Sequence, residues 1–320
     1  MTRPKPHVTS VLLIRRARAL KRHVAEAVKG DGTGVHQARV ASRRLREAVP
    51  VLAADVKGSR KGNAQRKIRR LTQALGQVRE LDVTLAILDD MAQRETFPRA
   101  ALEDVRGRVI NAREEGRELM LKRLDRIRLD KLDRRLELVA GTLDTQRAEA
   151  WREVLARRLL KRAKRLASAI EEAGHIYAPE RLHVVRIAVK KLRYSTELAA
   201  EAGHRDAARQ LATLKRAQEV LGRLHDLQVL QTHVAAVQAD PSRRSSSDRG
   251  LGIISAALER ECRYLHGRYV ALVPSLRAVA ASTRSSLVPQ LTRPARARRP
   301  LKMGLAPRQA GRVRAAEARR

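Results

Sequence analysis

Two segments of the chain carry a histidine followed by basic residues at the same spacing. In the first, Arg39, Arg43 and Arg46 lie three, seven and ten positions after His36. On a helix these four side chains form one narrow strip, because about 3.6 residues complete a turn. Arginine can bind two phosphate oxygens through its planar guanidinium, lysine adds a point charge, and histidine adds one hydrogen bond. The second segment provides the equivalent strip: His183, Arg186, Lys190 and Arg193.

The two strips belong to a longer internal repeat. They share the pattern H-x-x-R-[VI]-A-x-[RK]-[RK]-L-R, begin 147 residues apart, and place Arg44 and Lys191 at matching positions. A second match pairs LGQVRELDV, which starts at Leu75, with LGRLHDLQV, which starts at Leu221, at an offset of 146 residues. Two matches in the same order and at nearly the same offset indicate a duplicated unit. Its two basic strips suggest that the unit holds a polyanion.

Each strip is flanked by an apolar stripe on the same helix. We expect the stripe to face a helical core and the basic strip, displaced by one residue, to lie at the edge of that core with its charged heads in a groove. The predicted core positions are Val35, Ala38, Ser42, Leu45, Val49 and Leu52 in the first segment and Leu182, Val185, Val189, Leu192, Thr196 and Ala199 in the second.

Solvated charges that pair with acidic neighbours are the plainer interpretation of such a strip. The duplication argues against it, as does the scarcity of carboxylates, since Glu47 and Glu197 only touch the strip ends. Metal binding by His36 and His183 is disfavoured, because each is surrounded by cations and a metal site needs two or more converging ligands. We therefore expect no metal site and no cofactor.

The helix with the Leu-Gly motif presents a second polar face in each half. A glycine inside a helix costs about 1 kcal/mol relative to alanine, so Gly76 and Gly222 indicate close helix packing, with ligand access as the alternative. We expect Glu80 and Asp226 to pair with nearby arginines and orient them. The second face consists of Arg69, Thr72, Gly76 and Arg79 in the first half and of Lys215, Gln218, Gly222 and His225 in the second.

The composition restricts the classes of function. The 320 residues include 69 Lys and Arg against 34 Asp and Glu, a net charge of +35, which attracts nucleic acid, polyphosphate or anionic lipid. Aromatic residues make up only 2%, which argues against stacking on single-stranded bases. Cys262 is the only cysteine, so an intrachain disulfide and a cysteine-based zinc site are excluded. The sequence shows no signal peptide or membrane span, and we expect a cytoplasmic protein.

Helix-forming residues with apolar positions every three or four residues run through most of the chain, and strand patterns are nearly absent. We predict an all-α domain at 1–282, built of two similar antiparallel four-helix bundles at about 10–126 and 147–282. Residues 127–146 are predicted to connect the bundles, in part as helix, and 283–320 to form a disordered basic tail. The expected helices lie at about 10–29, 35–56, 61–94, 98–126, 147–173, 180–202, 205–238 and 251–281.

With these motifs the chain resembles the CHAD family, the conserved-histidine α-helical domain. The resemblance rests on VHQARVASRRLR at 35–46, LHVVRIAVKKLRYSTE at 182–197 and the two Leu-Gly motifs, and covers about residues 10–281. It implies two pseudo-twofold-related four-helix bundles with a basic groove between them. It also implies binding of inorganic polyphosphate and association with polyphosphate granules in bacterial cells. We find no E-x-E-x-K motif of the CYTH domain that often accompanies CHAD, and therefore expect a stand-alone, non-enzymatic binder.

The expected function is thus polyphosphate binding on cytoplasmic granules, with granule-associated proteins as further candidate partners. The alternative is a protein that coats a nucleic-acid backbone, with the tail at 283–320 as a contact. An enzyme acting on polyphosphate is a third interpretation, disfavoured by the lack of carboxylate clusters and of a nucleophile–base pair. The residues expected to bind polyphosphate are His36, Arg39, Arg43, Arg44, Arg46, Arg69, Arg79, His183, Arg186, Lys190, Lys191, Arg193, Lys215 and His225.

Overall fold

The structure of the protein, a computed structural model, describes residues 7–30, 32–94, 96–145, 150–240 and 248–292. Throughout these ranges the chain forms helices joined by short turns, and no residue lies in a strand. The predicted all-α fold is therefore confirmed. None of the helices in these ranges combines the length and apolar content that crossing a membrane requires.

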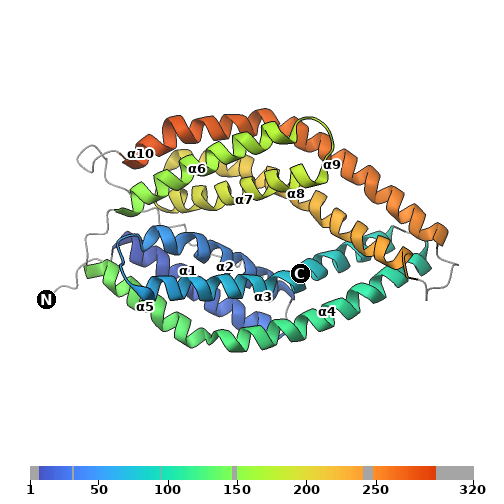
Figure 1. The fold of residues 1–320 in the computed structure, drawn as a ribbon, viewed down its shortest axis with the longest axis horizontal. Helices are drawn as coiled ribbons and strands as arrows, with labels where there is room; N and C mark the ends of the chain where they lie inside the picture. Colours follow the sequence, from blue (N-terminus) through green and yellow to red (C-terminus); the bar gives the residue numbers. More distant parts are fainter. Residues whose placement is uncertain (1–6, 31, 95, 146–149, 241–247, 293–320) are drawn as a thin grey trace, which may run out of the picture.

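Two halves follow each other along the chain, α1 to α5 in the first and α6 to α10 in the second (Figure 1). In each half a pair of shorter helices leads into a hairpin of two long helices, α3 with α4 and α8 with α9. The first half contains α1 (Val8–Val28), α2 (Gly32–Leu52), α3 (Ser59–Gln93), α4 (Arg99–Ile127) and α5 (Leu129–Thr145). The second contains α6 (Ala150–Ala173), α7 (Pro179–Glu201), α8 (Arg205–Gln238), α9 (Asp248–Ser282), the π-helix η2 (Thr283–Leu287) and α10 (Val288–Thr292).

All eight predicted helices are present, with ends no more than about four residues from the predicted positions. The apolar stripes that carry the basic strips form the core. Every predicted core position of α2 and α7 is buried, and Leu45 and Val49 in α2 and Val185 and Val189 in α7 are 0% exposed. Full burial of such a side chain stabilises the fold by about 1.5–3 kcal/mol. These stripes fix which way each basic strip points.

Helix α5 corrects the prediction for residues 127–146. Arg128 has a left-handed backbone, with φ of 51°, which ends α4, and α5 begins at the next residue. The apolar face of α5 is buried through Leu132, Leu136, Val139 and Leu143, and the helix packs on α1 and α3. The segment is therefore a packed element of the first half, which holds five helices instead of the predicted four.

The predicted disorder from residue 283 onwards is wrong for the stretch up to Thr292. There η2 and α10 continue the direction of α9 and pack on α6. The Thr283 hydroxyl donates to the Val279 carbonyl at 2.8 Å, and Leu287 and Leu291 are 0% exposed. The rest of the predicted tail, residues 293–320, lies outside the described residues.

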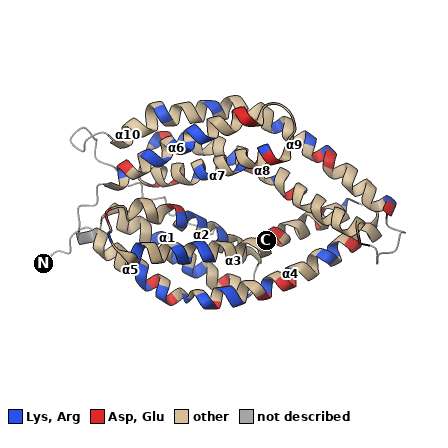
Figure 2. Ribbon diagram, viewed as in Figure 1, with Lys and Arg blue, Asp and Glu red and all other residues tan. Residues whose placement is uncertain are grey.

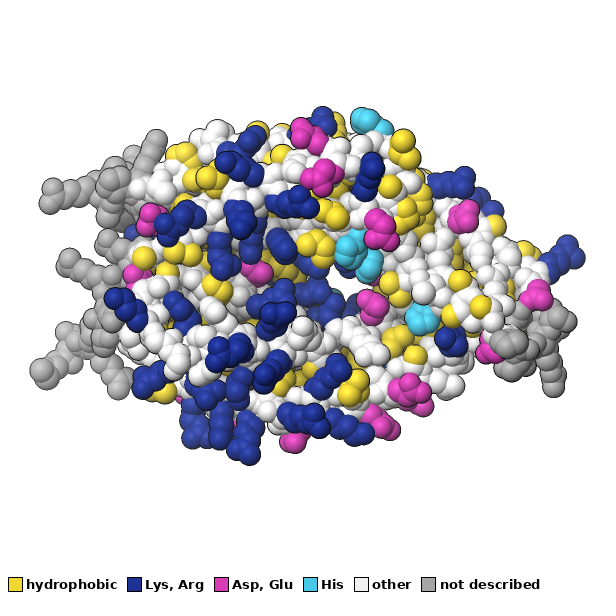
Figure 3. All heavy atoms as spheres, viewed as in Figure 1, with side chains coloured by type: hydrophobic (Ala, Val, Ile, Leu, Met, Phe, Trp, Pro, Cys, Tyr) yellow, Lys and Arg dark blue, Asp and Glu magenta, His cyan; other side chains and the backbone are white. Residues whose placement is uncertain are grey.

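The two halves meet near both ends of the molecule. At one end α2 packs on α6 and α7, and at the other α4 packs on α8 and α9 (Figure 1). Between these contacts the halves separate, and Figure 3 shows an opening there. Figure 2 shows Lys and Arg on α2, α3 and α7, the helices that border this region. The basic strips are thereby brought to the boundary between the halves.

Candidate anion-binding site between the two halves

The basic strips of α2 and α7 face each other across this boundary. Burial lowers the pKa of Lys190 in α7 and of Arg39 in α2, and charges across the boundary add to it: Arg43 of α2 acts on Lys190, and Arg186 of α7 acts more weakly on Arg39. Direct packing of α2 on α7 explains why the two helices act on each other. Figure 3 shows Lys and Arg side chains gathered beside the central opening. We call Arg39, Arg43, Arg46, Arg186 and Lys190 the inner cluster.

The inner cluster is a concentration of positive charge without ion pairs in the described ranges. Among strip residues in the described ranges, ion pairs involve Arg44 and Arg193 but no member of the cluster. Burial, and then the charges of the cluster arginines with Arg43 first, lower the pKa of Lys190 to about 7. The charge of Lys190 therefore responds to its surroundings near neutral pH. A bound anion would favour the charged form and raise this pKa.

The guanidinium of Arg39 in α2 lies against the backbone of α3 at Gly76. A Cβ atom there would lie 2.7 Å from Nη1 of Arg39 and 3.8 Å from its Cζ. Burial, followed by the charge of Arg43, lowers the pKa of Arg39 to about 10. This glycine therefore admits a charged group into the contact between α2 and α3. At its repeat partner Gly222, no atom of another described segment lies within 4 Å of the corresponding position, so the two glycines are not equivalent.

Histidines from both halves border the inner cluster. The ring centroids of His183 and His225 lie 5.2 Å apart. Burial, followed by the charge of Arg186, lowers the pKa of both rings, to about 4 for His225. Burial and then the charge of Arg79 lower the pKa of His36. These imidazoles are therefore neutral at pH 7, and each has one nitrogen that donates and one that accepts a hydrogen bond.

Two carboxylates moderate the charge of the site. Burial lowers the pKa of both Arg39 and Arg186, and the charge of Glu80 in α3 opposes this for both, as does the larger effect of Asp226 in α8 for Arg186. Burial raises the pKa of Asp226 itself, against the opposing charges of Arg186 and then Arg79. Glu80 and Asp226 therefore act on the arginines through their charges. In the described ranges no group of three or more His, Cys, Asp or Glu residues is placed to hold a metal ion.

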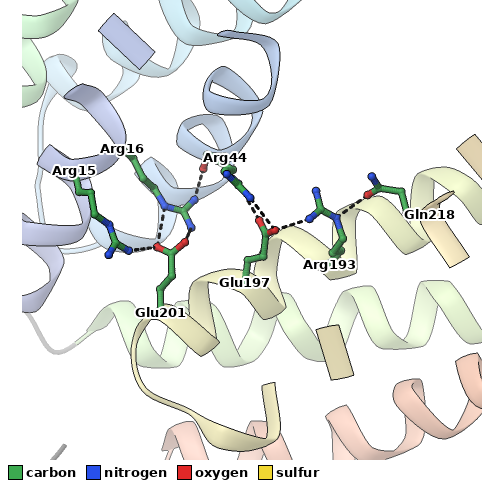
Figure 4. A network of polar contacts seen from close by, with 7 residues as sticks. All are labelled: Arg15, Arg16, Arg44, Arg193, Glu197, Glu201 and Gln218. Atoms are coloured by element: carbon green, nitrogen blue, oxygen red, sulfur yellow. Dashed lines mark hydrogen bonds and ion pairs between the residues drawn. The ribbon is translucent and has the colours of Figure 1, made fainter. Parts of the chain in front are cut away.

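Two of the predicted binding residues are engaged within the fold. Arg193 is 7% exposed, donates from Nη1 to Glu197, and donates from Nε to Oε1 of Gln218 at 2.7 Å (Figure 4). Arg44 in α2 donates to the same carboxylate from Nε and Nη2, both at 3.2 Å. Glu197 thus joins the two halves, whereas the sequence suggests only a contact at the strip end. For this reason Arg44 and Arg193 are not part of the inner cluster.

Further carboxylates join the halves beside this contact. We call Glu47, Glu197 and Glu201 the interface carboxylates, because each accepts from an arginine of the other half. The partners of Glu47 and Glu201 lie between 111 and 186 residues away in the chain, so no spacing within a single helix predicts them. The additional pairs are Glu201 with Arg15 at 2.7 Å and with Arg16 at 3.0 Å (Figure 4), and Glu47 with Arg158 at 3.5 Å and with Arg162.

The remaining predicted residues divide into two groups. Arg79 faces the site, since its charge acts on His36 and on Asp226 from opposite halves. The others are exposed, and no interaction in the described part of the chain connects them with the inner cluster. They are Arg69, Lys191 and Lys215.

Two solved structures have a similar fold. The CHAD domain from the plant Ricinus communis aligns with a TM-score of 0.55 at 23% identity, over 87% of this chain and 91% of that domain. PptA from Streptomyces chartreusis aligns with a TM-score of 0.62 at 14% identity, over 84% of this chain and 100% of that protein. At these identities the likeness concerns the fold.

Curated relatives include two uncharacterised proteins from two strains of Mycobacterium tuberculosis. Each is 29% identical over an alignment of 241 positions, and the match covers 70% of this chain and 45% of the relative. This chain therefore spans about half the length of the curated relatives that it matches. The family model described as the CHAD domain matches residues 12–235, which include both basic strips and both Leu-Gly motifs. The chain belongs to the CHAD domain family.

Proposed function

We propose that this protein binds inorganic polyphosphate between its two halves. The inner cluster carries the proposal, because cations from both halves gather there and no ion pair in the described ranges neutralises them. Their repulsion contributes to the lowered pKa of Lys190 and of Arg39. A chain that carries a negative charge on every phosphate would relieve this repulsion, and successive contacts would add avidity. Membership of the CHAD family, which is associated with polyphosphate binding, supports the same proposal.

Reversal of two charges in the inner cluster tests this proposal. Arg39→Glu combined with Arg186→Glu removes one contact from each half and places two carboxylates beside the phosphates. Since a hydrogen bond to a charged group contributes about 1.5–3 kcal/mol, the affinity for labelled long-chain polyphosphate should fall by about 100-fold or more. Titrations at physiological salt measure this loss, and the helical circular dichroism spectrum should remain that of the wild type.

A matched control separates this site from the net charge of the protein. Lys191→Glu combined with Lys215→Glu makes the same change in charge at exposed positions outside the inner cluster. We expect this variant to bind polyphosphate within a few-fold of the wild type. Equal losses in the two double variants, or wild-type affinity in the inner-cluster variant, would refute the assignment of the site.

Binding to a nucleic-acid backbone is the competing function, and the net charge of +35 is the observation that favours it. Competition between labelled polyphosphate and duplex DNA at matched phosphate concentration distinguishes the two. Polyphosphate that resists displacement supports a site shaped for a single flexible chain. Ready displacement would mean that the protein responds to charge density alone.

The proposal extends to location and to the fate of the ligand. A fluorescent fusion should gather on polyphosphate granules in cells, and the inner-cluster variant should be dispersed.

Because we propose binding without catalysis, the chain length of polyphosphate should be unchanged after prolonged incubation with the protein. Gel electrophoresis of the recovered polyphosphate measures this, and shortened chains would indicate an enzyme.

A further inference from the structure

A second group of cations lies on the outer side of the first half, away from the α2–α7 boundary. Burial lowers the pKa of Lys67 in α3, and the charges that add to this effect are, in order, those of Arg135, Lys131, Arg128 and Arg70. These residues come from α3, from α5 and from the turn between α4 and α5. We call the five residues the outer patch. Figure 3 shows Lys and Arg side chains crowded in this part of the first half, at the lower left.

The turn between α4 and α5 builds the centre of the outer patch. The left-handed backbone of Arg128 costs about 1–2 kcal/mol for a residue other than glycine, and it folds α5 back against α3. Lys67 stabilises the end of α4, because its Nζ donates to the Ile127 carbonyl at 2.5 Å. This bond uses one of the three ammonium donors. The other two remain available to a ligand.

Charges of opposite sign lie on opposite flanks of α5. Asp130, Asp133 and Glu137 follow the spacing i, i+3, i+7 and act on Lys21 of α1, which donates to Asp133 at 2.7 Å. Arg128, Lys131 and Arg135 follow the same spacing on the flank toward Lys67 of α3. Figure 2 shows both signs of charge where α4 meets α5. Asp133 is therefore paired with α1, and in the described ranges no outer-patch residue forms an ion pair, although Asp130 lines the same hollow as Arg128 and Lys131.

Helix α3 connects the outer patch with the site between the halves. It carries Arg79, which faces His36 and Asp226, and twelve residues earlier it carries Lys67. At about 1.5 Å per residue the two positions are about 18 Å apart along the helix. The exposed Arg69 lies between them. A flexible polyanion held at one position can therefore reach the other along a single helix.

We propose that the outer patch is a second phosphate-binding site, which holds an outer stretch of the same polyphosphate chain that occupies the inner cluster. This inference rests on the proposed function. A single phosphate chain can bend from the opening to the outer side of α3, whereas duplex DNA, with a persistence length of about 150 base pairs, cannot follow such a path. Engagement at two places makes binding depend on chain length, because the second contact is intramolecular.

Paired substitutions on α5 test the outer patch. Lys131→Gln combined with Arg135→Gln removes two cations that form no ion pair in the described ranges, so the fold should be preserved. The control, Arg260→Gln combined with Arg268→Gln, removes two exposed arginines of α9 and the same net charge. Full-length proteins are titrated with tripolyphosphate, long-chain polyphosphate and duplex DNA at several salt concentrations.

We expect the outer-patch variant to bind long-chain polyphosphate about tenfold more weakly. The slope of the logarithm of its binding constant against the logarithm of salt concentration should become less steep by about one for each lost contact. Its affinity for tripolyphosphate, and the control variant's affinity for both probes, should stay within twofold of the wild type. Wild-type affinity for the long chain in the outer-patch variant would overturn the inference and leave the proposed function intact. A loss confined to DNA would reassign the patch to nucleic acid and also overturn it. If the wild type binds neither phosphate probe, the proposed function fails first.

Discussion

Alanine at Gly76 tests whether Arg39 contributes to binding from a fixed position. The new Cβ atom would lie 2.7 Å from Nη1 of Arg39, whereas ordinary contacts begin at 3.4 Å, so the guanidinium must move by about 0.7 Å. The obstacle is the far end of a flexible side chain, so the fold can absorb the change. Gly222→Ala is the matched control in the other half of the repeat, because no atom of another described segment lies within 4 Å of its Cβ position.

The two substitutions should separate stability from binding. Alanine is favoured over glycine in a helix by about 1 kcal/mol, so Gly222→Ala should raise the melting temperature by about 1.5 °C in a chain of this length. Gly76→Ala should gain less, because part of that free energy is used to displace Arg39. Displacement of one charged hydrogen-bond donor, which contributes about 1.5 kcal/mol or more, should weaken polyphosphate binding by about tenfold. Gly222→Ala should bind like the wild type.

Thermal unfolding followed by circular dichroism and polyphosphate titration at one salt concentration measure the two effects. Wild-type affinity in Gly76→Ala would show that the position of Arg39 does not matter for binding. Equal losses of affinity in both variants would show that the glycines act through helix flexibility and not through Arg39. Either result refutes the reasoning from the contact between α2 and α3.

Three further predictions concern stability. Glu197→Gln leaves Arg193 buried without its carboxylate and should lower the free energy of unfolding by about 3 kcal/mol. Its control, Glu259→Gln, removes an exposed ion pair and should lower that free energy by about 0.5 kcal/mol or less. Thermal melts measure both variants. Folding lowers the pKa of Lys190 from 10.5 to about 7, so the unfolded chain binds more protons between these values and stability should rise with pH across this window. In thermal melts recorded at several pH values, Lys190→Gln should reduce the rise in stability with pH. Leu291→Ala, at a buried position of α10, should cost about 3 kcal/mol in chemical denaturation, while no loss would mean that α10 adds nothing to the fold.

The helices could be predicted from the sequence because their apolar stripes are local. Leu45 and Val49 in α2, like Val185 and Val189 in α7, recur at the spacing of one helical turn, and burial follows from that spacing alone. The same signal was present in α5, where Leu132, Leu136, Val139 and Leu143 repeat at steps of three and four residues. The internal repeat instead predicts four helices in each half and a connector at 127–146. The local pattern of apolar residues is the better guide here, because it reports directly on burial.

The site could be predicted only as far as one helix determines it. The repeat identified Arg39 and Arg186 because the strip is a property of α2 or of α7 by itself. Arg193 occupies the last position of its strip, yet its guanidinium meets Glu197 and Gln218. The spacing of Glu197 four residues after Arg193 was a local sign of this pairing. The link from Arg44 to Glu197 spans 153 residues and depends on how the halves pack, which no spacing within a helix reveals.

The arrangement of charges places attraction around the repulsion of the inner cluster. Arginines and a lysine at this density repel one another, and this repulsion adds to burial in lowering the pKa of Lys190. The interface carboxylates lie just outside the cluster, where Glu197 and Glu201 hold α7 against α1 and α2, and Glu47 holds α2 against α6. Attraction at the border therefore offsets repulsion inside it. Because an anion would strengthen the inner contacts without replacing the outer ones, ligand binding should add to the stability of the interface.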